Sequence, residues 1–122
     1  MLYPIVQPDR RFKGPAYKYL RASDKLPEYS QIDPDPICRV HLFLPGSRLE
    51  HFIYAATTYG STPVLTSYCV SPLGPDFNEE GDTALDDILA VRSKVFGLPM
   101  EREIGYEPER VSAIRERFSV YA

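Results

Sequence analysis

Hydrophobic and polar side chains alternate with a period of two along residues 38–44, a pattern typical of a half-buried β-strand. Residues 49–59 and 63–71 are rich in aromatic and β-branched side chains, which strands favour. A Pro-Gly-Ser turn follows the first segment, and Gly-Ser-Thr lies between the other two. Because short turns join consecutive antiparallel strands, the pattern predicts an antiparallel meander.

The spacing of apolar residues becomes helical after the meander. Apolar side chains recur at intervals of three and four along residues 85–95, and Asp82 or Thr83 is suited to cap the start of a helix. Gly97 is suited to a left-handed C-terminal cap, and Pro99 prevents the helix from continuing. The sequence therefore predicts one helix that starts at Thr83 and ends before Gly97.

The remaining segments are less regular. Residues 72–82 are rich in Pro and Gly and are predicted to be a loop. Residues 100–106 are compatible with a short strand, although polar and apolar positions do not separate cleanly there. Pro108 is well placed as the first residue of a last helix, whose apolar side reaches Phe118.

These elements predict an α+β fold, with a three- to four-stranded, mainly antiparallel sheet and two helices packed on one of its faces. A chain of 122 residues suits a single domain and leaves little room for a second. We expect residues 1–25 to form an irregular arm and residues 26–122 to form the α+β core. The predicted core side chains are Val40, Leu42, Leu44, Phe52, Tyr54, Val64, Leu65, Val70, Leu85, Ile88, Leu89, Val95, Ile114 and Phe118.

Charge is segregated along the chain. Residues 1–30 hold six Lys/Arg against three Asp/Glu, a local charge of +3, whereas residues 31–90 hold two against nine, a local charge of −7. Residues 91–122 hold six against five, a local charge of +1. A protein that binds nucleic acid usually has a stronger basic face, and an acidic surface is able to engage a basic protein surface instead.

This segregation gives three candidate surfaces for a partner. The acidic stretch is able to occupy a surface meant for phosphates, and the arm interleaves basic with aromatic residues, as single-stranded nucleic acid requires. A third candidate is the charged triplet after Met100. The candidate partner-binding residues are Asp76, Glu79, Glu80, Asp82, Asp86 and Asp87 of the acidic stretch, Arg10, Arg11 and Lys13 of the arm, and Glu101, Arg102 and Glu103 of the triplet.

No segment of the sequence resembles a signal peptide, and no stretch reaches the ~18 apolar residues that a membrane-spanning helix needs. We therefore expect a cytoplasmic protein without a membrane partner, in which Cys38 and Cys69 are reduced and buried. No GxxxxGK[ST] or GxGxxG loop is present, so no cofactor is predicted. An exposed strand edge leaves a symmetric homodimer open as the oligomeric state.

Cysteine and histidine are the candidate metal ligands and nucleophiles. The chain offers Cys38, His41, His51 and Cys69. Residues three apart on a strand face opposite sides, so Cys38 and His41 are not expected to reach one ion. The chain also lacks CxxC and HExxH patterns. Each cysteine lies in an apolar strand, where a thiol stays protonated, so we predict neither a metal site nor a cysteine nucleophile.

Paired carboxylates are the remaining candidates for catalysis. Glu101 and Glu103 would share one face of a short strand, with Arg102 on the other face. Two carboxylates on one face are able to act as an acid–base pair at the edge of a cleft. Such pairs are more often solvated or bound to arginines, and we favour that structural interpretation.

Part of the chain resembles the uncharacterised DUF2958 family, over about residues 26–108. The similarity lies in the segments LPEYSQ, HLFLP and LDDILAVRSKVFGLPMEREIGYEP, of which GLPMERE is the most specific. The chain departs from the family in the strand LEHFIYAA, which lacks the family's tryptophan, and in NEEGDTAL before the helix. The matching residues are Leu26, Pro27, Tyr29, Phe43, Pro45, Leu85, Ile88, Arg92, Gly97, Leu98, Pro99, Met100, Glu101, Arg102 and Glu103.

The resemblance implies a small accessory protein of a phage, plasmid or other mobile element, with no established catalytic site. An inhibitor of a host defence complex, such as an anti-CRISPR protein, is one form of that expectation. Because no catalytic constellation survives the spacing arguments and charge is segregated along the chain, we predict a non-enzymatic protein that binds a protein partner. The alternatives are nucleic-acid binding through the arm, and a small enzyme with a cleft at Glu101, Arg102 and Glu103.

Overall fold

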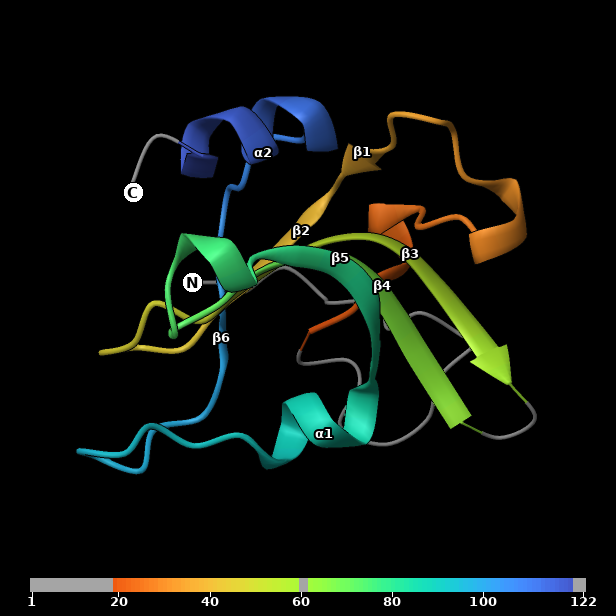
Figure 1. Cartoon of the computed structure of the whole chain (residues 1–122). Helices are drawn as coiled ribbons and strands as arrows, with labels where there is room; N and C mark the ends of the chain where they lie inside the picture. Colours follow the sequence, from red (N-terminus) through yellow and green to blue (C-terminus); the bar gives the residue numbers. More distant parts are fainter. Residues whose placement is uncertain (1–18, 60–61, 120–122) are drawn as a thin grey trace.

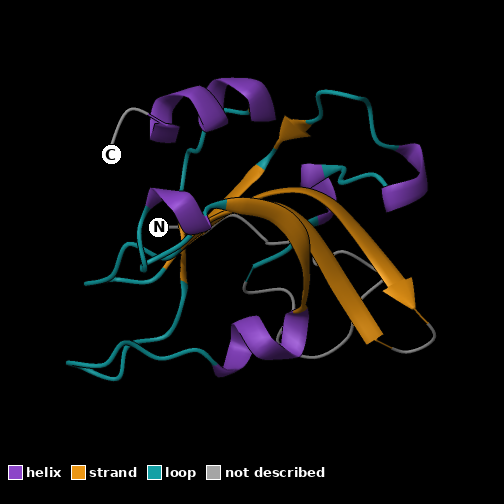
Figure 2. Cartoon of the chain, viewed as in Figure 1, coloured by secondary structure: helices purple, strands orange, loops and turns teal. Residues whose placement is uncertain are grey.

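The computed structural model describes residues 19–59 and 62–119, which form two antiparallel sheets and two α-helices (Figures 1 and 2). The larger sheet has five strands in the order β5-β4-β3-β2-β6, and the smaller pairs β1 with β7. The strands are β1 (Ile37–Cys38), β2 (Val40–Phe43), β3 (Glu50–Tyr59), β4 (Thr62–Val70), β5 (Glu79–Ala84), β6 (Glu101–Arg102) and β7 (Glu109–Arg110). The α-helices are α1 (Leu85–Ala90) and α2 (Val111–Ser119), and short 3₁₀ turns are η2 (Ala22–Asp24), η3 (Tyr29–Gln31) and η4 (Pro75–Phe77).

The α+β class, the mainly antiparallel sheet and the two helices are confirmed, but the strand number is wrong. Five strands replace the expected three or four, and a second sheet of two strands was not expected. The largest omission is β5, which lies where a loop was predicted. It is an edge strand whose first four residues are exposed, so it carries no apolar alternation. Charged residues at a sheet edge also prevent pairing with other chains.

The two helices pack on opposite faces of the larger sheet, which corrects the prediction of one shared face (Figure 1). Leu85 and Ile88 of α1 belong to a core cluster that includes Leu65 of β4. Val111 and Ile114 of α2 belong to a second cluster, with other residues of the same strands. Because successive strand residues point to opposite faces, each of β2, β3 and β4 contributes side chains to both sides. We call these the α1 face and the α2 face.

The described part of the N-terminal arm belongs to the α1 face. Tyr19 and Leu20 are buried in its core cluster, and the Tyr19 hydroxyl donates to the Met100 carbonyl at 3.0 Å. Arg102 donates two hydrogen bonds to the Asp24 carboxylate, at 2.6 and 2.7 Å, and one to the Tyr19 carbonyl at 2.6 Å. Asp24 is buried and Arg102 is half-buried, and their ion pair holds the segment before β1 against β6.

Helix α1 ends earlier and starts later than predicted. Its N-cap is Ala84, without a side-chain hydrogen bond, because Thr83 continues β5. After the helix, the Ser93 hydroxyl accepts a hydrogen bond from the Leu98 N–H at 2.9 Å, and the Ser93 carbonyl accepts one from Gly97 at 3.0 Å. Such local bonds compete with helical ones, so a tight turn replaces the last helical turns.

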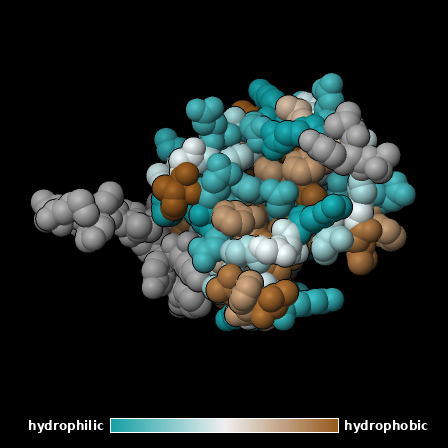
Figure 3. Space-filling model, turned by 90° about the vertical axis from the view of Figure 1, so that its left-hand side faces the viewer, coloured by the Kyte–Doolittle hydropathy of each residue, from teal (hydrophilic) through white to brown (hydrophobic). Residues whose placement is uncertain are grey.

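That turn exposes Val95, which corrects its predicted place in the core. Val95 and Phe96 are 77% and 78% exposed. Figure 3 views the side on which this turn projects and shows small apolar patches separated by hydrophilic surface. Val64, Leu89 and Phe118 are half-buried rather than buried. The other ten predicted core residues are buried: Val40, Leu42, Leu44, Phe52, Tyr54, Leu65, Val70, Leu85, Ile88 and Ile114.

Helix α2 starts three residues after the predicted Pro108. Glu109 and Arg110 form β7 instead, with Cys38 opposite Glu109 and Ile37 opposite Arg110. The predicted strand at 100–106 is present only as β6. Within the described ranges, no helix is long and apolar enough to cross a membrane.

Candidate functional site

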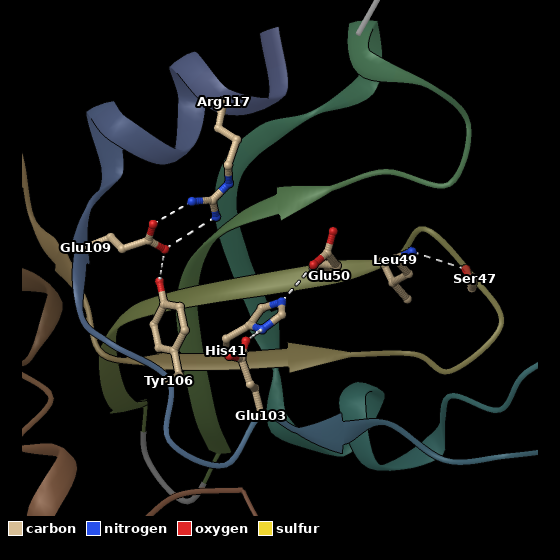
Figure 4. Close-up of polar contacts among 8 residues, drawn as sticks. All are labelled: His41, Ser47, Leu49, Glu50, Glu103, Tyr106, Glu109 and Arg117. Carbon is tan, nitrogen blue, oxygen red and sulfur yellow. Dashed lines mark hydrogen bonds and ion pairs between the residues drawn. The ribbon is translucent and has the colours of Figure 1, made fainter. Parts of the chain in front are cut away.

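His41 lies between two carboxylates on the α2 face (Figure 4). Its Nδ1 is 2.6 Å from Glu103 Oε1, and its Nε2 is 2.8 Å from Glu50 Oε1. The side chain of His41 is 10% exposed, whereas those of Glu50 and Glu103 are 25% and 45% exposed. Three titratable groups that are distant in sequence therefore converge on one point of the surface.

The register of the sheet produces this arrangement. Glu50 is the first residue of β3 and pairs with Phe43, two residues after His41 on β2. Residues two apart on a strand share a face, so Glu50 and His41 are diagonal neighbours. On the other side, the Glu103 N–H donates to the His41 carbonyl at 3.0 Å and extends the pairing of β6 with β2. Glu103 is thereby placed beside the imidazole.

The two carboxylates control the charge of His41. Burial on its own would lower the pKa of His41, but its hydrogen bonds to Glu50 and Glu103, together with the negative charges of these carboxylates, raise the pKa above its ordinary value. Because each ring nitrogen faces a carboxylate oxygen, the doubly protonated imidazolium donates to both. The three groups then carry a net charge of −1.

Aromatic rings surround the imidazole. Its ring stacks on Phe52, with centroids 4.3 Å apart, and on Phe43 at 5.8 Å. Tyr106 lies at 5.5 Å in a tilted arrangement. Such rings present negative faces that stabilise cations above them. The aromatic surroundings and the carboxylates therefore favour positive charge at the same place.

A second ion pair lies next to this cluster. The Arg117 guanidinium donates to both oxygens of Glu109, and the Tyr106 hydroxyl donates to Glu109 Oε2 at 2.6 Å (Figure 4). Arg117 also lies over the rings of Phe52 and Phe118, at 5.6 and 5.3 Å from their centroids. Although burial would raise the pKa of Glu109, the bonds from Arg117 and Tyr106 lower it below its usual range.

An open hollow of about 1030 Å³ adjoins the His41 cluster, and we call it the His41 hollow. The turn between β2 and β3 forms one wall, and η4 with the segment before it forms another. Arg48, on that turn, is exposed and makes no hydrogen bond or ion pair with the described residues. The lining residues are His41, Phe43, Ser47, Arg48, Glu50, Val70, Ser71, Gly74, Pro75, Asn78, Glu103 and Phe118.

None of the six predicted acidic residues lines the hollow. All six are exposed. Two have partners: Glu80 accepts from Tyr54 and pairs with Arg115, and Asp82 accepts from Thr66. The six are Asp76 on η4, Glu79, Glu80 and Asp82 on β5, and Asp86 and Asp87 on α1.

The predicted charged triplet is divided between the two faces. Arg102 points to the α1 face, where it binds Asp24, and Glu103 points to the His41 hollow. Glu101 pairs opposite Phe43 and so shares the face of Glu103, but it does not line the hollow. The expected alternation of these three residues is present, and the three do not form one cleft. Arg10, Arg11 and Lys13 of the arm lie outside the described residues.

The two cysteines are free thiols. Cys38 is buried and Cys69 is half-buried, so the expected burial is correct only for Cys38. Burial raises the pKa of the Cys38 thiol to about 12 and also raises the pKa of Cys69, which keeps both protonated. The interruption of the strand at Arg39 places Cys38 on the same face as His41, contrary to the alternation argument. No described group of three His, Cys, Asp or Glu side chains is arranged to hold a metal ion.

The sequence interpretation did not foresee the His41 cluster. Its available signal was the position of His41 on the polar side of a strongly alternating strand, next to a turn that leads to Glu50. Pairing the two predicted strands across that turn would have placed Glu50 near His41. The approach of Glu103 had no comparable signal, because β6 is a strand of two residues.

Comparisons of the chain with protein-family models, with curated proteins and with solved structures find no match. The resemblance to the DUF2958 family and the cytoplasmic location therefore stay predictions.

Proposed function

We propose that this protein is a non-enzymatic binding protein that engages a protein partner through the His41 hollow. The observation that carries the proposal is the convergence of His41, Glu50 and Glu103 beside an open hollow with aromatic walls. Aromatic and arginine side chains that fill well-packed pockets supply most of the binding energy of many protein interfaces.

The hydrogen bonds of His41 favour binding over catalysis. A general base needs a free lone pair within reach of the proton that it removes. Both ring nitrogens of His41 already contact carboxylate oxygens, so neither is free to take a proton from a substrate. The hollow is also open to solvent, whereas acid–base sites gain strength from the exclusion of water.

A photocrosslinking experiment tests the proposal. The residue p-benzoylphenylalanine is placed at Ser47, on the rim of the hollow, and in a matched variant at Asp87, on the opposite face. Each replaces an exposed side chain, and Ser47 loses only its bond from the Leu49 N–H. We expect a discrete protein adduct from Ser47 and none from Asp87, reproduced with the two purified proteins.

The same experiment addresses the acidic surface as an alternative site. An adduct from Asp87 alone would contradict the hollow and favour the acidic surface as a mimic of phosphates. Charge reversal at Glu79, Asp86 and Asp87, which have no ion pairs among the described residues, should then slow association and weaken its salt dependence. Glu80 is omitted because it holds Tyr54 and Arg115.

The broader proposal, an accessory protein of a mobile element that inhibits a host defence complex, rests on the family resemblance alone. Its test is plasmid interference in cells with an active defence system, with and without this protein. Nucleic-acid binding through Arg10, Arg11 and Lys13 is tested by gel shift against salt, where an absent shift or a flat salt response counts against it.

A further inference from the structure

We infer that the His41 hollow recognises a cationic side chain of the partner, and specifically an arginine. This inference rests on the proposed function, since it names the chemical group that the hollow would take. It follows from the unused acceptor oxygens of Glu50 and Glu103, from the way in which Arg117 is already bound on the same face, and from the shape of the hollow.

The carboxylates have unused acceptor capacity. Glu50 and Glu103 each give one oxygen to His41, and their other oxygens make no hydrogen bond within the described chain. An ionised carboxylate has about four acceptor positions, so most remain free on each. With a net charge of −1 even when His41 is protonated, the cluster attracts one further cation.

The α2 face already holds a guanidinium in this manner. Arg117 lies over Phe52 and Phe118, and it donates to both oxygens of Glu109. The His41 hollow repeats the chemistry a short distance away, with Phe118 and a second aromatic ring beside two carboxylates. In this second place no described arginine of the chain pairs with the carboxylates.

Arg48 does not fill that place. It lines the hollow from the turn between β2 and β3 but forms no ion pair with Glu50 or Glu103. Its exposed guanidinium is positioned to donate to a carbonyl or carboxylate next to the bound cation. The hollow therefore presents acceptors on one wall and a donor on another, as a peptide segment requires.

The shape of the hollow favours a long side chain from a protein. Its volume of about 1030 Å³ exceeds the space of one side chain and admits a short stretch of peptide. Val70, Pro75 and Phe118 supply apolar wall against which the stem of a long basic residue packs. Arginine fits better than lysine because its planar guanidinium stacks on rings and donates to two carboxylates at once.

The test uses single amino-acid amides as probes on the full, ¹⁵N-labelled chain. N-acetylarginine amide is titrated against N-acetylcitrulline amide, a neutral analogue of the same shape, and against N-acetyllysine amide. We expect shifts of the Phe43, Glu50 and Glu103 amides with arginine, smaller shifts with lysine and none with citrulline. The variants Glu50→Gln and Glu103→Gln should each weaken arginine binding about tenfold.

The matched control is Glu101→Gln, which removes a carboxylate from the same face outside the hollow and should leave binding unchanged. If the NMR spectrum of Glu50→Gln shows that this variant is unfolded, the test relies on Glu103→Gln, because Glu103 is more exposed. Equal binding of arginine and citrulline, or shifts confined to residues 79–87, would overturn the inference. If either of these results is obtained but a protein adduct forms at Ser47, the hollow binds a partner through a group other than arginine. If no adduct forms at Ser47, the proposed function itself is wrong.

Discussion

The two histidines of the larger sheet lie on adjacent strands and are both buried, but their pKa values are shifted in opposite directions. Counted over the whole residue, His41 is 8% exposed and lies on the α2 face, while His51 is 6% exposed and pairs with Leu42, which lies on the α1 face. Carboxylates contact both ring nitrogens of His41, but the hydrogen-bond partner of His51 within the described chain is the Ser67 hydroxyl, 3.1 Å from Nδ1. Burial lowers the pKa of His51 to about 4, whereas the pKa of His41 is raised.

This difference shows that burial alone does not determine the charge of a histidine. The apolar environment disfavours the charged form at both positions, and only Glu50 and Glu103 reverse the result. The α1 face is thus built for packing. The α2 face keeps a charged cluster next to a hollow, which is where recognition of a partner is proposed.

The largest expected effect concerns His51. Its folded pKa is below the unfolded value near 6.5, so the unfolded chain binds more protons between pH 6.5 and about 4. Folding stability should therefore fall by about 3 kcal/mol as the pH falls through this window. Urea unfolding at several pH values measures this loss, and His51→Gln should abolish that part of it.

Because pH acts on every ionisable group of the chain, the comparison is between His51→Gln and the original protein rather than between pH values alone. The two stability curves should converge as the pH falls toward 4. Parallel curves would contradict a neutral, buried His51.

The second effect concerns Glu50, the less exposed of the two carboxylates at His41. Glu50→Gln should lower the pKa of His41 and cost about 1–3 kcal/mol near pH 6, because it removes an ionic hydrogen bond. NMR titration of the imidazole measures the pKa, and urea unfolding measures the stability. Since the folded pKa is raised, this stabilisation is complete below pH ~6.5 and is lost as the pH rises through the folded pKa.

Glu103→Gln is the matched variant at the other ring nitrogen. Glu103 is 45% exposed, so solvent screens its charge more strongly. It should lower the pKa of His41 less than Glu50→Gln does and cost less than ~1 kcal/mol. A larger effect at Glu103 than at Glu50 would show that solvent exposure does not rank the two contacts.

The smallest effect on histidine charge concerns Ser67. Ser67→Ala removes a neutral hydrogen bond from His51 and should cost about 1 kcal/mol. The pKa of His51 should stay low, because burial and not the hydroxyl is its cause. NMR titration of His51 checks this, and a return to an ordinary pKa would show that Ser67 contributes to the charge difference between the two histidines.

Prediction from the sequence was correct for the strands that bury one side against the core, and it was wrong for the elements that are mostly exposed to solvent. The meander of β2, β3 and β4 followed from alternation and turn residues. The edge strand β5 carries Glu79, Glu80 and Asp82, so no apolar period marks it. Helix α1 was predicted too long because Val91 and Val95 continue the helical spacing, although the side chain of Ser93 closes a turn that runs from Ser93 to Leu98 and contains Val95.

The site required information that the sequence does not display locally. Alternation correctly placed Glu103 and Arg102 on different faces, but which strand would lie beside them depends on the pairing of β6 with β2. That pairing involves only two residues of β6, and it is supported by the distant contact between Arg102 and Asp24. Tertiary contacts, rather than local propensity, therefore assemble the His41 cluster.

The hydrogen bonds of Arg102 to Asp24 and Tyr19 also connect the beginning of the described chain to the rim of the hollow. Arg102 binds Tyr19 and Asp24 on one side of the sheet, and the next residue, Glu103, places its carboxylate beside His41 on the other side. A protein or protease that displaced Tyr19 would break a contact of Arg102 and so remove part of the support for the neighbouring Glu103. The Arg102 contacts lie on the α1 face and the Glu103 contact lies on the α2 face. Loss of the contacts on the α1 face would therefore change the position of a carboxylate on the α2 face.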